Sequence, residues 1–113
     1  MTFIENIKAL FSEPFESIST NELENLLASK NIQLIDVRTP EEFKQSHISK
    51  ARNVPLSQIN SFVAPKDKKV YVICQSGMRS KKAAHHLTKK GYQVINVRGG
   101  MSQWQGKVIG GQK

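Results

Sequence analysis

The hydrophobic residues of this chain alternate between runs of strand length and runs with helical spacing. Apolar runs of strand length occupy five segments: 15–19, 32–37, 51–55, 70–73 and 92–97. Helical spacing or helix-start signals mark four segments between them: 19–30, 39–45, 56–63 and 80–90. Strands that alternate with helices predict an α/β domain built on a mostly parallel sheet.

Two of the predicted helices begin with capping boxes, in which the side chains at N-cap and N3 each accept a hydrogen bond from the other's backbone N–H. Ser19 precedes Glu22 by three residues, and Thr39 precedes Glu42 in the same way. Pro40 strengthens the second start, because its fixed φ suits the first helical position. Local sequence therefore predicts where both helices begin.

The two ends of the chain are expected to lie outside a domain that spans residues 15–105. Over residues 1–14, apolar side chains share one helical face, which predicts an amphipathic helix or extension packed on the domain. These side chains are Phe3, Ile4, Ile7, Leu10 and Phe11. A membrane-surface role is less favoured, because Lys8 alone gives little attraction for anionic lipid. Residues 106–113 are basic and rich in glycine, which predicts a flexible tail.

Composition places the chain among single-domain globular proteins. Its 113 residues are 38% hydrophobic and 23% charged. No apolar run approaches the ~20 residues that span a bilayer, and the first residues lack the basic start of a signal peptide. A cytoplasmic location without membrane association is therefore expected. The single cysteine excludes an internal disulfide framework and a multi-cysteine metal site, and neither a metal nor another cofactor is expected.

The net charge of +8 is unevenly distributed along the chain. Residues 1–42 carry eight acidic and three basic side chains, whereas residues 43–113 carry fourteen basic side chains and one acidic one. Most of the excess is scattered lysine without interleaved aromatic residues, so nucleic-acid binding is not expected as the primary function. The positive charge instead favours steering of a small anionic substrate toward the segment around Cys74.

The stretch over residues 69–91 combines the only cysteine with a geometry suited to anions. A buried strand ends at Cys74, a short loop containing Gly77 follows, and a helix is predicted to begin near Ser80. A strand, a tight loop and a helix start direct several backbone N–H groups toward one point. Arg79 and nearby lysines add positive charge, which favours the reactive thiolate form of a cysteine.

A cysteine at the end of a buried strand often serves only as a small hydrophobic residue. Here four residues, one of them glycine, separate Cys74 from Arg79 at a strand-to-helix junction. Ser76 and Ser80 add hydroxyl donors. Together these features favour a cysteine nucleophile whose substrate or reacting form is anionic.

The segment CQSGMRS, residues 74–80, resembles the active-site loop of the single-domain rhodaneses, which are thiosulfate and persulfide sulfurtransferases. The resemblance extends over about residues 15–105. It includes four further segments in matching order: LIDVRTPEEFKQSHI, ARNVPL, YVIC and RGGMSQW. Several ordered motifs are far more specific than a lone cysteine and arginine at this spacing.

The resemblance implies a rhodanese-like three-layer fold, with helices on both faces of a sheet of about five strands. It also implies that Cys74 takes sulfur from a donor such as thiosulfate, forms a persulfide, and passes the sulfur to cyanide, a thiol or a protein. The backbone N–H groups that would hold this sulfur belong to Gln75, Ser76, Gly77, Met78, Arg79 and Ser80. Converging N–H dipoles stabilise an anionic persulfide.

Three further roles follow from the resemblance. Arg79 would bind and orient the anionic donor. Asp36, at the end of its strand, would bond to the active loop or to Arg79, and Arg38 would line the entrance. The sequence departs from the family pattern at residues 47–51, His-Ile-Ser-Lys-Ala in place of the common His-Ile-Pro-Gly-Ala, and at Gln75, where a charged residue is frequent.

The three histidines and the tryptophan are interpreted without a catalytic role. His47 is expected to form structural hydrogen bonds and not to act as a catalytic base. His85 is expected to be solvated and His86 to lie at the margin of the core, while Trp104 is expected in the core. Neither helix histidine has a neighbour that suggests a metal site.

Two other classes of function remain open at this point. A protein-tyrosine or Cdc25-like phosphatase, or an arsenate reductase, also uses a cysteine, a backbone anion cradle and an arginine, but with five residues between them to enclose a tetrahedral oxyanion. A persulfide carrier would use the same chemistry with protein partners only. With no second cysteine in the chain, sulfur release is expected to need an acceptor in trans, such as a small thiol, thioredoxin or a sulfur-accepting protein. The oligomeric state is not predicted.

Overall fold

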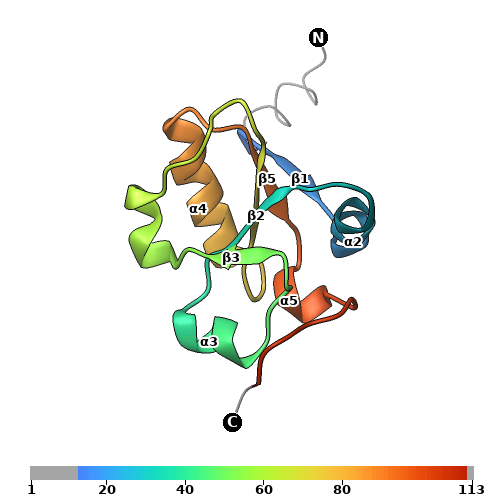
Figure 1. The fold of residues 1–113 in the computed structure, drawn as a ribbon. Coiled ribbons are helices and arrows are strands. Elements are labelled where there is room, and N and C mark those ends of the chain that lie inside the picture. The colour runs from blue at the N-terminus through green and yellow to red at the C-terminus, as the bar shows by residue number, and fades with distance from the viewer. Residues whose placement is uncertain (1–12, 112–113) are drawn as a thin grey trace, which may run out of the picture.

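Five strands form one parallel sheet at the centre of the computed structural model, which describes residues 13–111 (Figure 1). In chain order the strands are β1 (Glu16–Ile18), β2 (Gln33–Asp36), β3 (Ala51–Asn53), β4 (Val70–Ile73) and β5 (Val94–Val97). Their order across the sheet is β1-β5-β4-β2-β3, and every neighbouring pair is parallel. The predicted α/β fold with a sheet of about five strands is confirmed. The helix predicted for the first residues falls almost entirely outside the described part of the chain.

Helices cover both faces of the sheet and complete the three layers (Figure 1). They are α2 (Thr20–Ser29), α3 (Pro40–Gln45), the 3-10 helix η1 (Leu56–Ser61), α4 (Met78–Lys89) and α5 (Gly100–Gln103). On one face, α4 packs its Leu87 in a core that includes Val72 of β4. On the other face, α2 packs its Leu23 in a second core that includes Ile73. Successive residues of β4 thus enter opposite cores, which explains why this strand is apolar throughout.

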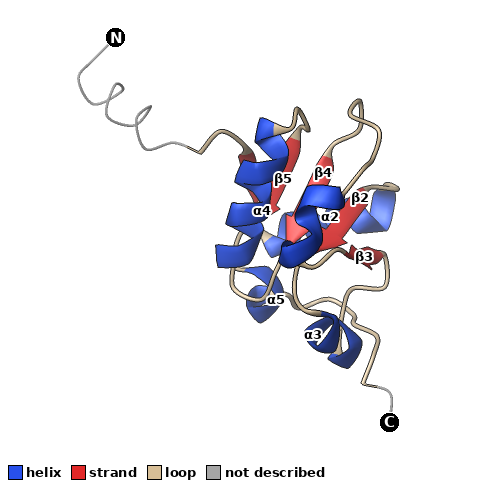
Figure 2. Cartoon of the chain, turned by 90° about the vertical axis from the view of Figure 1, so that its left-hand side faces the viewer, coloured by secondary structure: helices blue, strands red, loops and turns tan. Residues whose placement is uncertain are grey.

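Three helices begin where the central strands end. α3 follows β2, α4 follows β4 and α5 follows β5, so all three helix starts gather at the carboxyl edge of the sheet. Figure 2 shows α3 and α5 beyond the strand ends. In parallel α/β sheets this edge is where ligands bind. The fold therefore brings Cys74 and its loop to the edge at which the chemistry was predicted.

Helix starts follow the predicted signals closely, with one difference. Both capping boxes are present, at Ser19 before α2 and at Thr39 before α3. The helix predicted to begin near Ser80 instead begins at Met78, because Gly77 is its N-cap with a φ of 107°. This left-handed conformation suits glycine and lets α4 start two residues earlier, closer to Cys74.

The end of the chain, for which a flexible tail is predicted, forms backbone hydrogen bonds with the domain as far as Gly111. His47 and Ile109 exchange two backbone hydrogen bonds, each 2.8 Å long, in an antiparallel bridge. The N–H of Gly111 donates to the carbonyl of Lys44 at 3.1 Å. Residues 107–111 are therefore attached to the end of α3, because their extended backbone finds unpaired groups there.

The core packing of α4 gives a first prediction. Leu87 is 0% exposed, so Leu87→Ala should lower the free energy of unfolding by about 2–5 kcal/mol through lost burial and a residual cavity. Val63 is 80% exposed, and Val63→Ala serves as the control, with an effect within about 0.5 kcal/mol. Urea unfolding followed by circular dichroism measures both. Equal losses in the two variants would contradict the packing described here.

Candidate active site

Cys74 lies directly after β4 and is only 1% exposed, beneath the loop that leads into α4. Its Sγ accepts a hydrogen bond from the N–H of Gly77 at 2.9 Å. The Sγ also lies 3.4 Å from the Ser80 Oγ, and the Ser80 hydroxyl donates to the Gly77 carbonyl at 3.1 Å. The sulfur is therefore held between the loop backbone and the first turn of a twelve-residue helix. A helix N-terminus and a backbone N–H both favour negative charge on that sulfur.

A glycine turn after β5 supports the loop from behind. The Met101 N–H donates to the Cys74 carbonyl at 2.8 Å, and the Ser102 N–H donates to the Gln75 carbonyl at 2.9 Å. Gly100, with a φ of 59°, approaches so closely that a Cβ would lie 2.2 Å from the Cys74 oxygen. The segment RGGMSQW thus forms the rear wall of the site. In the sequence this segment is recognisable as a motif, but its role becomes apparent only in the structure.

Arg79 pairs with Glu42, the N3 residue of α3. Its Nη1 and Nη2 donate to the two carboxylate oxygens at 2.6 Å and 2.9 Å, and Thr39 donates a further hydrogen bond from its backbone. Hydrogen bonding from Arg79 is the main reason that the pKa of Glu42 falls to about 2, against the opposing effect of burial. The same pair raises the pKa of Arg79. In the sequence Glu42 is recognisable only as a capping residue. The one signal for its pairing with Arg79 is that the capping box places a carboxylate at the carboxyl edge of the sheet.

Asp36 and Arg38 form a buried pair, which corrects two details of the prediction. Asp36 was expected to contact the loop or Arg79, but it binds Arg38, with Nη2 and Oδ2 2.8 Å apart. Arg38 was expected to line an entrance, but it is 3% exposed. The Arg38 N–H donates to Asp36 Oδ1 at 3.0 Å, and this turn folds the arginine back over the strand end.

Arg38 nevertheless connects Asp36 to the active loop. Its Nη1 donates to the Gln75 Oε1 at 3.3 Å, and its Nη2 donates to the Ser46 carbonyl at 2.7 Å. A buried carboxylate thus fixes an arginine that reaches the residue next to Cys74. Both side chains are better described as supports of the loop than as an entrance.

The other predicted site residues line the outside of the loop. Gln75, Ser76 and Met78 are exposed, Met78 to 72%. Gly77 is buried and provides the N–H that reaches the sulfur. The loop therefore presents its backbone to Cys74 and its side chains to the surroundings.

The histidines lie away from the sulfur. His47 stacks on Phe43, and its Nδ1 lies 2.6 Å from the Phe43 carbonyl. His85 was expected to be solvated and is exposed; its Nε2 lies 2.8 Å from a Glu13 carboxylate oxygen and its ring packs edge-on against Phe15. Within residues 13–111, no group of three or more His, Cys, Asp or Glu side chains could hold a metal ion.

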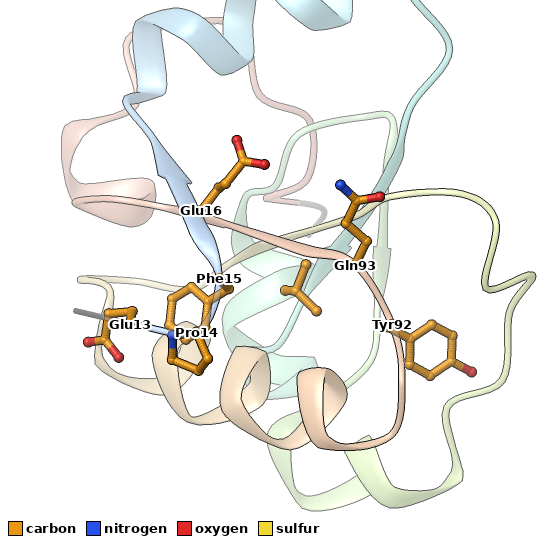
Figure 3. A pocket seen from close by; sticks show the side chains of 7 residues that line it. Glu13, Pro14, Phe15, Glu16, Tyr92 and Gln93 are labelled. Atoms are coloured by element: carbon orange, nitrogen blue, oxygen red, sulfur yellow. The ribbon is translucent and has the colours of Figure 1, made fainter. Parts of the chain in front are cut away.

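A surface hollow lies at the amino edge of the sheet, opposite Cys74, near the starts of β1 and β5 (Figure 3). It has a volume of about 530 Å³ and is lined by residues 13–16 and 92–94. Figure 3 shows that Gln93 and Tyr92 point in different directions. No cysteine is among the lining residues, so this hollow has no thiol, and the candidate site remains the Cys74 loop.

The rear wall gives a second prediction. Gly100→Ala should destabilise the protein by about 2–3 kcal/mol, because it adds both a left-handed alanine and a contact with the Cys74 carbonyl. Gly91→Ala is the control: Gly91 has a φ of 98° but only ordinary contacts at 3.8 Å, so its cost should stay near 1 kcal/mol. Urea unfolding distinguishes them, and equal costs would show that the close approach is unimportant.

The Glu42–Arg79 pair gives a third prediction, about pH. Because folding lowers the pKa of Glu42 from 4.5 to about 2, its stabilising effect is present above pH 4.5 and is lost as the pH falls toward 2. Glu42→Gln should therefore reduce stability at pH 7, and the difference from the wild type should vanish near pH 2.

A third of each side chain in this pair is exposed, so solvent screening limits the effect at pH 7 to about 0.5–1 kcal/mol. Glu41→Gln, one residue earlier in α3, is the matched control and should show a smaller and flatter difference. Urea unfolding of all three proteins between pH 7 and pH 2 tests this. A constant wild-type advantage over Glu42→Gln across that range would show that the pair does not stabilise the fold.

The sequence and the fold of this chain were compared with those of known proteins. Residues 19–107 match the family model described as a Rhodanese-like domain. The chain is 45% identical over 82 residues to Uncharacterized protein YqhL of Bacillus subtilis (strain 168), a match that covers 70% of this chain and 65% of YqhL. This chain thus spans slightly less than two thirds of that relative.

In two further comparisons the matched region covers nearly all of the other protein. Thiosulfate sulfurtransferase GlpE of Shewanella oneidensis is 31% identical over 93 residues, which are 80% of this chain and 92% of that protein. The structure of a Rhodanese-like Domain Protein from Staphylococcus aureus is similar with a TM-score of 0.77 and 37% identity, covering 85% of this chain and 98% of that one. The chain therefore belongs to the rhodanese family.

Proposed function

We propose that this protein moves sulfane sulfur from thiosulfate or a persulfide donor to a thiol, cyanide or protein acceptor, through a persulfide on Cys74. The observation that carries the proposal is the 2.9 Å hydrogen bond from the Gly77 N–H to the Cys74 sulfur at the start of α4. A relative named thiosulfate sulfurtransferase, 31% identical, supports the same reaction type.

The first half of the reaction charges the cysteine. The Cys74 thiolate attacks the outer sulfur of thiosulfate, the sulfur–sulfur bond of the donor breaks, and sulfite leaves with the bonding electrons. The product is a persulfide whose terminal sulfur carries the negative charge. The backbone N–H groups of residues 75–80 are proposed to surround this position, as the Gly77 N–H already bonds to Sγ, and fixed dipoles of this kind stabilise the charge without reorganisation.

The second half returns the cysteine to its starting state. A nucleophilic acceptor attacks the terminal sulfur, the bond between that sulfur and Sγ breaks, and the electron pair returns to Cys74 as thiolate. The chain has one cysteine, so no second thiol of this chain can take the sulfur. The acceptor is therefore a separate molecule, such as a small thiol, thioredoxin or a sulfur-accepting protein.

Arg79 is proposed to attract and orient the anionic donor. Glu42 holds the Nη1 and Nη2 edge of its guanidinium, and 34% of the side chain is exposed. The pair fixes the arginine next to the loop and also offsets much of its charge. Arg79 is thus expected to contribute directed hydrogen bonds more than long-range attraction.

The length of the loop favours sulfur over phosphate. Four residues separate Cys74 from Arg79, and the N–H of Gly77 already reaches the sulfur. A loop that encloses a tetrahedral oxyanion needs room for four oxygen substituents around its centre, whereas a persulfide adds a single atom. Phosphatase or arsenate reductase activity is for this reason the less favoured reading.

A cytoplasmic location is proposed with this chemistry, because a reducing compartment keeps a thiol of this kind free. None of the helices within residues 13–111 is long and apolar enough to cross a membrane.

The central prediction concerns the sulfur on Cys74. After incubation with thiosulfate, intact-mass spectrometry should show the gain of one sulfur atom, and later addition of cyanide should remove it and yield thiocyanate. Cys74→Ser should show neither effect, whereas Val63→Ala, a substitution of an exposed residue, should behave as the wild type.

Two other results would change the proposal. Absence of sulfur gain together with hydrolysis of an aryl phosphate would replace sulfur transfer by phosphatase chemistry. Charging by a protein persulfide but not by thiosulfate would restrict the function to a persulfide carrier. Discharge of the loaded protein in the absence of any acceptor would contradict the requirement for a molecule in trans.

A further inference from the structure

The short helix α3 holds both ends of the active loop. Glu42, in its first turn, accepts two hydrogen bonds from Arg79 at the end of the loop. Ser46, the C-cap residue of α3, accepts a hydrogen bond at its carbonyl from Arg38, which also donates to Gln75 at the start of the loop. The position of α3 therefore sets the positions of the two arginines that contact the loop.

α3 has little packing of its own to fix that position. It spans six residues, and none of them is buried. A helix of this length is not stable in isolation, because its first turn costs more than the few hydrogen bonds return. The capping box at Thr39 fixes where the helix begins but not where its far end lies. The orientation of α3 must therefore come from contacts with other parts of the chain.

The C-terminal strap, residues 107–111, provides such contacts at the far end of α3, where Figure 2 shows the chain returning. His47 and Ile109 exchange two backbone hydrogen bonds, each 2.8 Å long. The N–H of Gly111 donates to the Lys44 carbonyl at 3.1 Å. The strap is thus attached to α3 by backbone hydrogen bonds, which do not depend on the identity of its side chains.

The strap is also closely fitted to α3 and tied to the body of the domain. A Cβ on Gly110, which has a φ of 119°, would lie 2.6 Å from the Lys44 oxygen. At the other end, the Trp104 Nε1–H donates to the Lys107 carbonyl at 3.1 Å, and Trp104 packs against the core beside α2. The strap therefore joins the far end of α3 to that core.

We propose that the strap is a positioning element for Arg79, and through it for the anionic sulfur donor. The strap holds the far end of α3, α3 carries Glu42, and Glu42 holds the Nη1 and Nη2 edge of the guanidinium. If α3 moves, Arg79 loses the carboxylate that fixes it beside the loop, and its hydrogen bonds lose their direction. The inference rests on the proposed role of Arg79 in binding the donor.

Alkylation of Cys74 tests the proposal without the sulfur-transfer reaction. Iodoacetate and iodoacetamide have nearly the same shape, and in both the thiolate displaces iodide from the CH₂ group. Only iodoacetate has a carboxylate for Arg79 to bind, so the ratio of the two rate constants reports how well the arginine is positioned. The fraction of thiolate affects both reactions equally and cancels in this ratio. The chain has one cysteine, so intact-mass spectrometry measures both rates directly.

Two full-length variants should loosen the strap in different ways. Gly110→Ala adds a Cβ against the Lys44 carbonyl, and Ile109→Pro removes the N–H that donates to His47. Each should lower the iodoacetate-to-iodoacetamide ratio about three- to tenfold, because charge-assisted hydrogen bonds to the carboxylate weaken. Gly91→Ala is the matched control, because Gly91 is also left-handed but has only ordinary contacts at 3.8 Å, and it should leave the ratio unchanged.

A double variant separates the positioning of Arg79 from a general loss of structure. Arg79→Gln should lower the ratio about tenfold, and adding Gly110→Ala to it should lower the ratio no further, because the strap acts through the arginine. Detachment of the strap is followed by hydrogen exchange of the His47 N–H, which should be faster in both strap variants.

Four results would overturn the proposal. A wild-type ratio in strap variants with faster His47 exchange would show that α3 holds Arg79 without the strap, and unchanged exchange in both would show that the strap does not fix α3. A wild-type ratio in Arg79→Gln would show that the arginine does not bind the anion. A further drop in the double variant would show that the strap acts elsewhere. None of these results bears on the gain of sulfur by Cys74, and failure of that gain would leave the alkylation ratios unaffected.

Discussion

The contact between the glycine turn after β5 and the carbonyls after β4 is the constraint on which the site depends. Gly100 fits against the Cys74 oxygen where no Cβ has room, and the N–H groups of Met101 and Ser102 bond the carbonyls of Cys74 and Gln75. With these carbonyls bonded from behind, the loop keeps its N–H side toward the sulfur. Free carbonyls could rotate toward the sulfur and repel a negative charge on it.

Charge at this edge of the sheet is balanced more tightly than the overall excess of basic residues suggests. The buried Asp36 neutralises Arg38, and Glu42 neutralises Arg79 while it also caps α3. The positive potential that remains near Cys74 comes from the start of α4 and from lysine and arginine side chains outside these pairs. The arginines closest to the loop therefore act mainly as fixed hydrogen-bond donors and braces.

Local features of the fold were predictable from the sequence, and contacts between distant segments were not. The capping boxes and the apolar run of β4 depend on a few neighbouring residues, so their signals were complete in the sequence. The partners of Asp36 and Arg79, the close approach of Gly100 and the bridge between His47 and Ile109 depend on how separate strands and turns come together.

The pairing of β1 with β5 joins the first strand of the sheet to its last, and this has a consequence for biosynthesis. As the ribosome releases the chain from its N-terminal end, Cys74 emerges before β5 and before the turn that bonds its carbonyl. Until those later residues arrive, the cysteine is attached to an unfinished sheet and has no rear wall. The surroundings of Cys74 are thus completed only when the last strand and its turn have joined the sheet.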